Sequence, residues 1–292
     1  MKKSVPLAVV GGDLRLAVLA ELLSADGHTV SVSALERHTF GSGVHRAGAD
    51  GFGVQQAQAV ILPIPAESSD GLLNAPLSNT SYHTQAILDA IPPGKLVLAG
   101  AVSQGLYLRA AQNGLHLVDY LQREELAIRN AVPTCEGALQ LAMEELPITL
   151  HGAKALVIGN GRIGSLLAQK LAALHAVVTV SARSARDFAR IQAAGHAYLH
   201  TGALPGHLAG FDLVVNTVPA RVLGLMELSE LPENCLILDL ASKPGGVDLT
   251  AASQLGRHAV WALSLPGKVA PVSAAQAIRD TIYAILQEEA LL

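Results

Sequence analysis

The chain has 292 residues, which at about 150 residues per domain predicts two domains with separate hydrophobic cores. Half of the residues are hydrophobic, only 15% are charged, and the net charge is −4 without any cluster of basic residues. This composition excludes a disordered chain and argues against nucleic acid as a partner. Because so little of the chain is charged, we expect a homo-oligomer in which another subunit covers apolar surface.

Apolar stretches such as 96–102 and 235–240 are much shorter than the roughly 18 residues of a membrane-spanning helix. The N-terminus leads directly into a strand pattern, so we expect neither a membrane partner nor a signal peptide. Cys135 and Cys235 stand alone, which argues against disulfides and structural zinc. The eleven histidines show no metal-ligand spacing, so we expect no metal. These features predict a cytoplasmic protein.

Short β-branched runs alternate with amphipathic segments of helix length, a pattern typical of parallel sheets. The fold class is therefore α/β, with two open parallel-sheet domains. The first, residues 1–122, is expected to be a flavodoxin-like or Rossmann-like domain on the substrate side. Its expected strands are 5–10, 29–33, 59–64, 96–99 and 115–118, and its expected helices are 13–27, 80–90 and 103–113.

Two helical segments, 122–131 and 133–146, are predicted to form a bridge between the domains over residues 123–150, with Pro133 in the first turn of the second helix. A Rossmann domain follows at residues 151–272, with expected strands 154–159, 177–181, 212–217, 236–240 and 259–262. Residues 265–271 are expected to form a rigid turn. The last helix, 273–292, should begin at a capping box of Ser273 and Gln276 and pack back onto the first domain.

The clearest motif opens the second domain, where residues 155–164 read ALVIGNGRIG, a strand followed by G-x-G-x-x-G and a helix. The first glycine permits the tight turn, the second lets backbone amides approach a diphosphate, and the third allows close helix packing. A tight strand–helix turn without a ligand is the simpler alternative. The predicted cofactor contacts here are Gly159, Gly161, Arg162, Ile163 and Gly164.

The next strand, 177–181, should end where a carboxylate would bind the ribose 2′-hydroxyl of NAD. No carboxylate stands there, and we expect Ser181, Arg183 and Ser184 to contact the cofactor instead. Hydroxyl and guanidinium groups favour a 2′-phosphate, which predicts NADP as the cofactor. Arg186 could contribute in the same way. Either arginine could instead be a solvated residue at the start of a helix.

Two polar segments follow later strands of the second sheet and should lie at its carboxyl edge, beside the nicotinamide half of the cofactor. The predicted contacts are Thr217, Val218, Pro219, Asp239, Ala241 and Ser242. Lys243 could anchor a carboxylate of an acidic substrate, and Lys268 could reach the same crevice. Each could equally be a solvated loop lysine.

A dense set of polar residues lies on the predicted bridge, where clefts between domains form. Glu124 or Glu125 could act as a general base, and Arg123 or Arg129 could hold a substrate carboxylate. The alternative is a surface ion-pair network. The candidate catalytic residues are Glu124, Glu125, Arg129, Asn130, Thr134 and Lys243. The turn after the first strand could also face the cleft through Gly12, Asp13 and Arg15, although an ordinary helix start explains Asp13 equally well.

Together these segments resemble the family of dipicolinate synthase A subunits over nearly the whole chain. The resemblance lies in residues 10–15, 60–63, 123–134, 136–137, 181–184, 216–219, 236–246 and 265–271 and in the glycine motif. It departs at Lys243, where we expect arginine, and at Lys268, where we expect an aliphatic residue. Lysine keeps the charge at position 243 but loses the bidentate fork.

The resemblance implies NADP-linked oxidation of dihydrodipicolinate, or of its hydroxy-tetrahydro precursor, to dipicolinate. It also implies a place on a branch of the lysine pathway in the mother cell of a sporulating bacterium, a small dicarboxylate substrate and a flavoprotein-like B subunit. A dihydropyridine gains aromaticity on giving up a hydride, so the protein mainly orients the ring. Arg129 and Lys243 are our hypothesis for the two carboxylate anchors, with Glu124 or Glu125 accepting the proton.

Two other functions fit the same motifs. One is a different two-domain NADP enzyme of the shikimate dehydrogenase or 2-hydroxyacid dehydrogenase type, although we find no characteristic catalytic pair for either. The other is a non-catalytic NADP-binding subunit that stabilises or regulates a partner.

Overall fold

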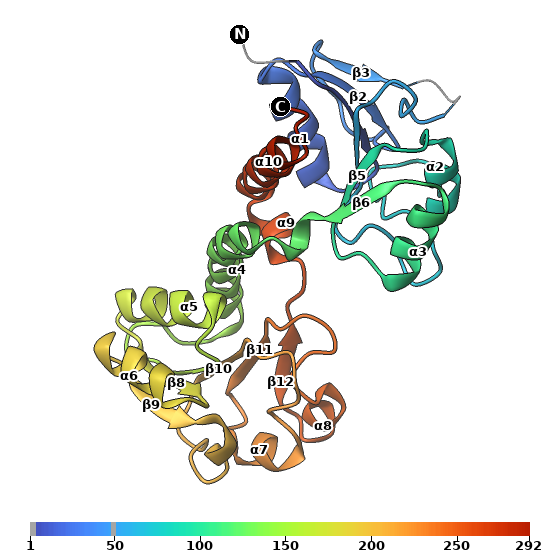
Figure 1. Ribbon diagram of the computed structural model, residues 1–292. Coiled ribbons are helices and arrows are strands. Elements are labelled where there is room, and N and C mark those ends of the chain that lie inside the picture. Colours follow the sequence, from blue (N-terminus) through green and yellow to red (C-terminus); the bar gives the residue numbers. More distant parts are fainter. Residues whose placement is uncertain (1–3, 48–50) are drawn as a thin grey trace. The chain divides into compact units, whose positions relative to one another are not determined.

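The computed structural model describes residues 4–47 and 51–292 (Figure 1). The chain divides into two compact units, one formed by Met1–Asn130 with Ala270–Leu292 and the other by Ala131–Val269. Each unit contains one six-stranded parallel sheet with helices on both faces. The predicted α/β class with two open parallel sheets is confirmed. Within the described residues, no helix has the length and apolar character needed to span a membrane.

The first sheet follows the Rossmann strand order. It contains β1 (Pro6–Val10), β2 (Thr29–Ser33), β3 (Val44–Arg46), β4 (Ala59–Ile61), β5 (Leu96–Ala99) and β6 (His116–Asp119), in the order β3-β2-β1-β4-β5-β6. The order reverses between β1 and β4, where ligands bind in open α/β sheets. Of the two descriptions expected for this domain, the strand order supports the Rossmann-like one.

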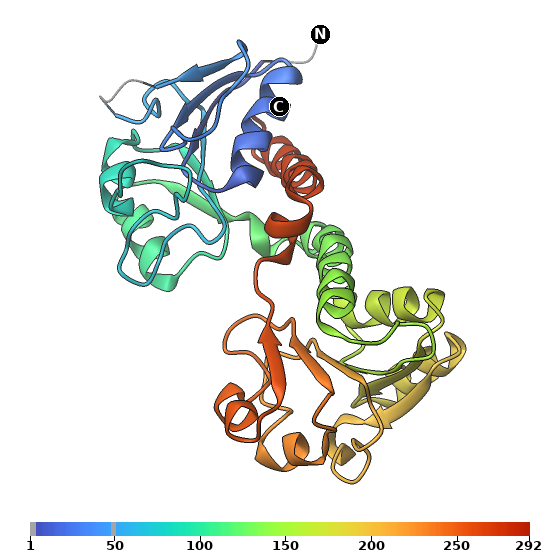
Figure 2. The same ribbon diagram turned by 180° about the vertical axis from the view of Figure 1, so that it is seen from behind.

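Both faces of the first sheet are covered, which is why its strands are apolar at nearly every position. Leu7 and Val9 pack against α1 (Leu14–Ala25) and α10 (Pro271–Glu288). Ala8 and Val10 face the other layer, with α2 (Thr84–Ala90) and α3 (Gln104–Gln112). The two views show α10 beside α1 (Figures 1 and 2), so the last helix of the chain completes the first unit.

The second sheet repeats the same topology. Its strands are β7 (Lys154–Ile158), β8 (Val177–Ala182), β9 (Ala197–His200), β10 (Leu213–Asn216), β11 (Leu236–Asp239) and β12 (His258–Trp261), in the order β12-β11-β10-β7-β8-β9. One face packs against residues 135–142 of α4 (Glu124–Glu145), α5 (Arg162–Ala173) and α6 (Ala185–Ala193). The other face packs against α7 (Leu225–Glu230) and α8 (Leu249–Gln254). The strand order reverses between β7 and β10.

One helix replaces the two predicted around Pro133. The structure has a single α4 with Pro133 inside it, and the prediction that this proline opens a second helix is wrong. An internal proline costs a helix about 3 kcal/mol. Leu126, buried in the core of the first unit, and Cys135 and Ala138, buried in the core of the second, offset that cost.

Other differences lie at element ends and sheet edges. The last helix begins at Pro271 and has no side-chain cap, so the predicted capping box of Ser273 is wrong. The predicted turn contains a short helix, α9 (Leu265–Val269). The edge strands β3 and β9 were not predicted, because their partly exposed, polar sequences lack an apolar run. Two 3-10 turns, η1 (Tyr120–Gln122) and η2 (Thr201–Ala203), complete the structure.

Candidate cofactor site

The turn between β7 and α5 lies at the point where the second sheet reverses its strand order. Gly159 has a φ of +100°, a conformation that favours glycine, and a Cβ on Gly164 would overlap the carbonyl oxygen of Gly159. The turn itself therefore requires both glycines. Gly161 is different, because a Cβ there would meet no atom within 4 Å. It is the N-cap of α5 and leaves open the space before the helix N-terminus, where a diphosphate binds.

A groove of about 970 Å³ runs along this turn. It extends past the start of α6 to the segment that follows β10. The structure brings together here most of the residues predicted as cofactor contacts: Gly159, Gly161, Arg162, Arg183, Ser184, Thr217, Val218 and Pro219. Thr217 also fixes the turn, since its hydroxyl donates to the carbonyl oxygen of Ile158 at 2.8 Å.

Several predicted contacts lie beneath the groove or beside it. Ser181 is fully buried, and its hydroxyl lies 3.1 Å from that of Thr201, which lines the groove. Gly164 is buried and Ile163 half-buried in the first turn of α5. The structure gives Ser181 a supporting position beneath the groove, and Gly164 has the close packing of α5 that was predicted for it.

Asp239 organises the loop that carries Lys243. It is 2% exposed, and its carboxylate accepts hydrogen bonds from the backbone amides of Ala241, Gly246 and Val247 and from Asn216 Nδ2. The expectation that Asp239 and the buried Ala241 touch the cofactor does not fit this burial. Ser242 and Lys243 are exposed on the same loop, so Asp239 positions them.

The arginines of the groove differ in how they are paired. Arg183, Arg186 and Arg190 donate no hydrogen bond to any described residue, whereas Arg221 lies 2.5 Å from Asp248. Arg186 and Arg190 approach Asp187 Oδ1 to 3.9 and 4.0 Å, which is too far for a hydrogen bond. Elsewhere arginines are engaged, for example Arg15, Arg123 and Arg257. The groove therefore presents three guanidinium groups with unused donors, from Arg183 just before α6, Arg186 in its first turn and Arg190 in its last turn.

Asp187 was not among the predicted site residues, although it also lines the groove. Ser184 Oγ accepts from the Asp187 amide at 3.1 Å and donates to Asp187 Oδ2 at 2.6 Å. The spacing Ser-x-x-Asp at a helix start could have indicated this cap. The Asp187 carboxylate is committed to the cap and lies near Arg186 and Arg190, and with Arg183 on the same groove this end keeps a net positive charge.

Arg129 of α4, and Arg123 immediately before this helix, form ion pairs with α10. Arg123 lies 2.8 Å from Glu125 and 2.6 Å from Glu288, and Arg129 lies 2.5 Å from Asp280. The pKa of Glu125 is lowered by its own backbone amide and by Arg123, which makes it a weaker base. The structure supports the alternative of an ion-pair network for these residues.

The remaining candidates on this helix differ in exposure. Glu124 is exposed, Asn130 is half-buried and Thr134 is 9% exposed, and each has a polar interaction within the protein. Lys268 is exposed on α9. Among the described residues, no group of His, Cys, Asp or Glu side chains could hold a metal ion.

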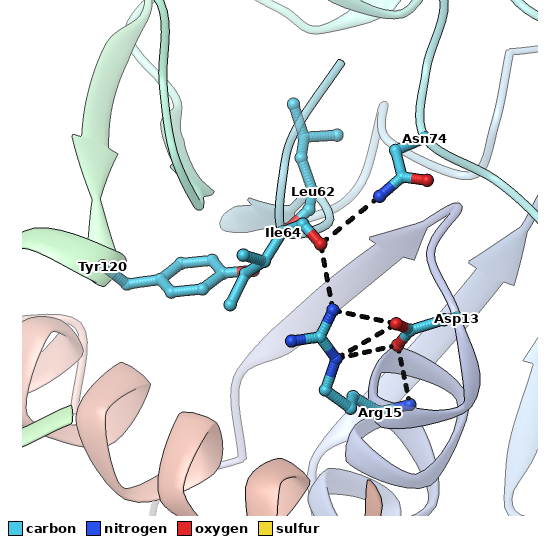
Figure 3. Close-up of polar contacts among 6 residues, drawn as sticks. All are labelled: Asp13, Arg15, Leu62, Ile64, Asn74 and Tyr120. Carbon is cyan, nitrogen blue, oxygen red and sulfur yellow. Dashed lines mark hydrogen bonds and ion pairs between the residues drawn. The ribbon is translucent and has the colours of Figure 1, made fainter. Parts of the chain in front are cut away.

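The turn between β1 and α1 is the counterpart of the glycine turn in the second unit. Gly11 N donates to Ser33 O at 2.9 Å, as Gly159 N donates to Ser181 O at 2.9 Å. The N-cap of α1, however, is Asp13, whose carboxylate accepts the Arg15 amide at 3.0 Å (Figure 3). The N-terminus of α1 therefore carries a carboxylate. The N-terminus of α5 in the second unit has none and stays open. Asp13 takes up a donor of the helix N-terminus that a diphosphate would use, so this turn does not favour a diphosphate.

Comparisons with known proteins match the two units to different family models. The family model for the N-terminal domain of the dipicolinate synthase A subunit matches residues 6–121, and a putative NAD(P)-binding model matches residues 146–226. The dipicolinate synthase A subunit of Bacillus subtilis (strain 168) is 36% identical over 292 residues, covering 99% of this chain and 98% of that protein.

Solved structures of dipicolinate synthase A subunits are similar to this chain over nearly its whole length. The structure of the dipicolinate synthase A subunit from Bacillus halodurans has a TM-score of 0.91 at 32% identity, covering 98% of this chain and 99% of that one. The corresponding structure from Bacillus subtilis has a TM-score of 0.88 at 34% identity, covering 99% and 97%. A transhydrogenase from Sinorhizobium meliloti, at 16% identity and a TM-score of 0.70 over 96% and 94%, shares the fold.

Proposed function

The chain belongs to the family of dipicolinate synthase A subunits, and from this premise we propose that it oxidises dihydrodipicolinate, or its hydroxy-tetrahydro precursor, to dipicolinate with NADP as hydride acceptor. It is an oxidoreductase with an NAD(P)-binding domain. We further propose that the cofactor is NADP rather than NAD. The hydride donor is a CH–CH bond of a dihydropyridine dicarboxylate.

The observation that carries the choice of NADP is the set of unused guanidinium donors that line the groove along α6. The 2′-phosphate of NADP is a phosphate monoester with about two negative charges at neutral pH. Arg183 and Arg190 offer it charge-assisted hydrogen bonds, each worth about 1.5–3 kcal/mol. NAD has only a hydroxyl at this position and would leave the cations unpaired.

The residues of the second unit would bind and orient the cofactor. Gly161 leaves the N-terminus of α5 open to the diphosphate, and the loop after β10 lies on the same groove. A cofactor held there would supply the hydride acceptor. Asn216 and Asp239, joined at 2.7 Å, hold the loops after β10 and β11, and the second of these loops carries Lys243. We propose Lys243 as one anchor for a substrate carboxylate.

The proposal extends to partners. The Bacillus subtilis relative is named as the A subunit of its enzyme, which implies a partner subunit for that protein. We propose that this chain likewise acts with a flavoprotein-like B subunit, as a homo-oligomer in the cytoplasm of the mother cell of a sporulating bacterium. The route would be a branch of lysine synthesis.

Calorimetry with NADP and NAD tests the cofactor proposal. We expect NADP to bind wild-type protein at least about tenfold more tightly than NAD, as the loss of one charge-assisted hydrogen bond requires. Arg183→Gln with Arg190→Gln should abolish this preference without weakening NAD. Arg221→Gln is the matched control, because this arginine lines the groove but is paired with Asp248. Equal affinities in wild type would contradict the choice of NADP.

Turnover tests the reaction. Wild-type chain given NADP and dihydrodipicolinate should form NADPH and dipicolinate, either alone or after addition of the B subunit. If NADP binds but neither condition gives NADPH, a non-catalytic NADP-binding subunit becomes the better description.

A further inference from the structure

Arg15 lies at the point where the first sheet reverses its strand order. It follows β1 in the chain, and its Nη2 donates to the carbonyl oxygen of Ile64, just beyond β4, at 3.0 Å. Arg15 is 6% exposed, so its charge is removed from bulk water. In open α/β sheets this location is where ligands bind.

The ion pair with Asp13 leaves one side of the guanidinium unused. Nε donates to Asp13 Oδ1 and Oδ2 at 3.0 and 3.1 Å, and Nη2 donates to Oδ2 at 2.8 Å. Nη1 donates to none of the described residues and is not sealed from solvent. Figure 3 shows this nitrogen pointing away from Asp13 and Asn74. Linking the two strand ends therefore does not require Nη1.

The backbone of the same turn also has unused donors. The amides of Gly12 and Asp13 donate to no acceptor in the described part of the chain, although Gly12 is buried. A buried amide without an acceptor is costly and rare. Nη1 and these two amides are therefore the donors around the turn that the described residues leave unused.

We infer that this turn binds a carboxylate of the dicarboxylate substrate, with Arg15 Nη1 as the principal donor. The identity of the ligand rests on the proposed function. Asp13 neutralises Arg15, so the turn supplies directed donors without net positive charge, which suits a single carboxylate better than a diphosphate. Because hydrogen bonds to Asp13 and Ile64 already fix the guanidinium, little side-chain entropy is lost on binding.

Arg15→Lys tests the inference, because lysine keeps the charge but cannot hold the ion pair and present Nη1 together. We expect the Kd of pyridine-2,6-dicarboxylate and the KM of the substrate to rise at least about tenfold. The Kd of NADP should not change. The matched control is Arg109→Lys, which alters another arginine–carboxylate pair of the first unit, that with Glu67. Arg109→Lys should leave both ligands unaffected.

Hydrogen–deuterium exchange on wild-type chain provides a second measurement that does not depend on the folding of a variant. Pyridine-2,6-dicarboxylate should slow exchange at the amides of Gly12 and Asp13. If dicarboxylate binds but neither these amides nor Arg15→Lys respond, the inference is overturned while the proposed function stands. If wild-type chain binds neither NADP nor dicarboxylate, both are overturned.

Discussion

Gly161 and Gly164 belong to one turn, yet they serve different purposes. A Cβ on Gly164 would overlap the backbone of Gly159, whereas a Cβ on Gly161 would enter open space in the groove. Gly164 is therefore needed by the fold, and Gly161 by the ligand that we propose. The same distinction applies to Ser184, which caps α6 and lines the groove, and Ser181, which is buried under it.

Two alanine substitutions separate these purposes. Gly161→Ala should keep the wild-type Tm and weaken NADP binding at least about tenfold, because its methyl group occupies the space of the diphosphate. Gly164→Ala should lower the free energy of unfolding by about 1–3 kcal/mol, as overpacking does, and weaken binding as a consequence. Differential scanning calorimetry and titration calorimetry measure the two effects. A Gly161→Ala protein with unchanged NADP affinity would place the diphosphate elsewhere.

At the level of elements, α4 and α10 are joined by ion pairs within the first unit. Arg123, the residue before α4, bridges Glu125 in the first turn of α4 and Glu288 on α10. Hydrogen bonds from Arg123 hold the pKa of Glu288 below its ordinary value of 4.5. These groups are exposed, so the contribution of each pair to stability is small and depends on salt. Because these charged residues pair with α10, charged residues at three- to four-residue spacing on a helix need not indicate catalysis.

Arg123→Gln should therefore have a pH-dependent effect. A carboxylate with a lowered pKa in the folded state stabilises the fold above its unfolded pKa and loses this effect as the pH falls through the folded value. The urea midpoints of wild type and variant should differ above about pH 4.5 and converge below it. The double variant Arg123→Gln with Glu288→Gln should resemble Arg123→Gln alone. A difference that persists unchanged in acid would contradict the ion pair.

At the level of the whole molecule, two sheets of identical strand order behave differently. The second sheet carries an open glycine turn with a groove, and the first carries an acidic N-cap with Leu73 packed at Gly11. Strand order alone would allow two nucleotides per chain. The residues at the two turns allow one.

Titration calorimetry should therefore give one NADP per chain. Hydrogen–deuterium exchange should show NADP protection at 159–165 and 183–190 with none of comparable size at 11–15. Two equivalents, or equal protection of both turns, would show that the Asp13 carboxylate does not exclude a diphosphate.

Elements with a strong apolar pattern and the motif with local chemistry could be predicted from the sequence. The strands at 29–33 and 96–99 and the glycine turn follow from neighbouring residues, because periodicity and backbone conformation are local properties. The edge strands β3 and β9 and the continuity of α4 through Pro133 did not follow. Packing against distant residues stabilises them, and this overrides local preference.

Some residues of the candidate site could likewise be predicted from the sequence, and others could not. Gly159 and Gly164 were predictable from their spacing, since the turn fixes their roles. Three features became visible only in the folded chain: Arg129 pairs with Asp280, Asp239 holds a loop from beneath, and Arg15 keeps an unused donor beside Ile64. Each of these depends on which residues lie close together after folding. An ion pair or hydrogen bond is set by a distance of a few ångströms, and spacing along the chain does not specify that distance for residues on different elements.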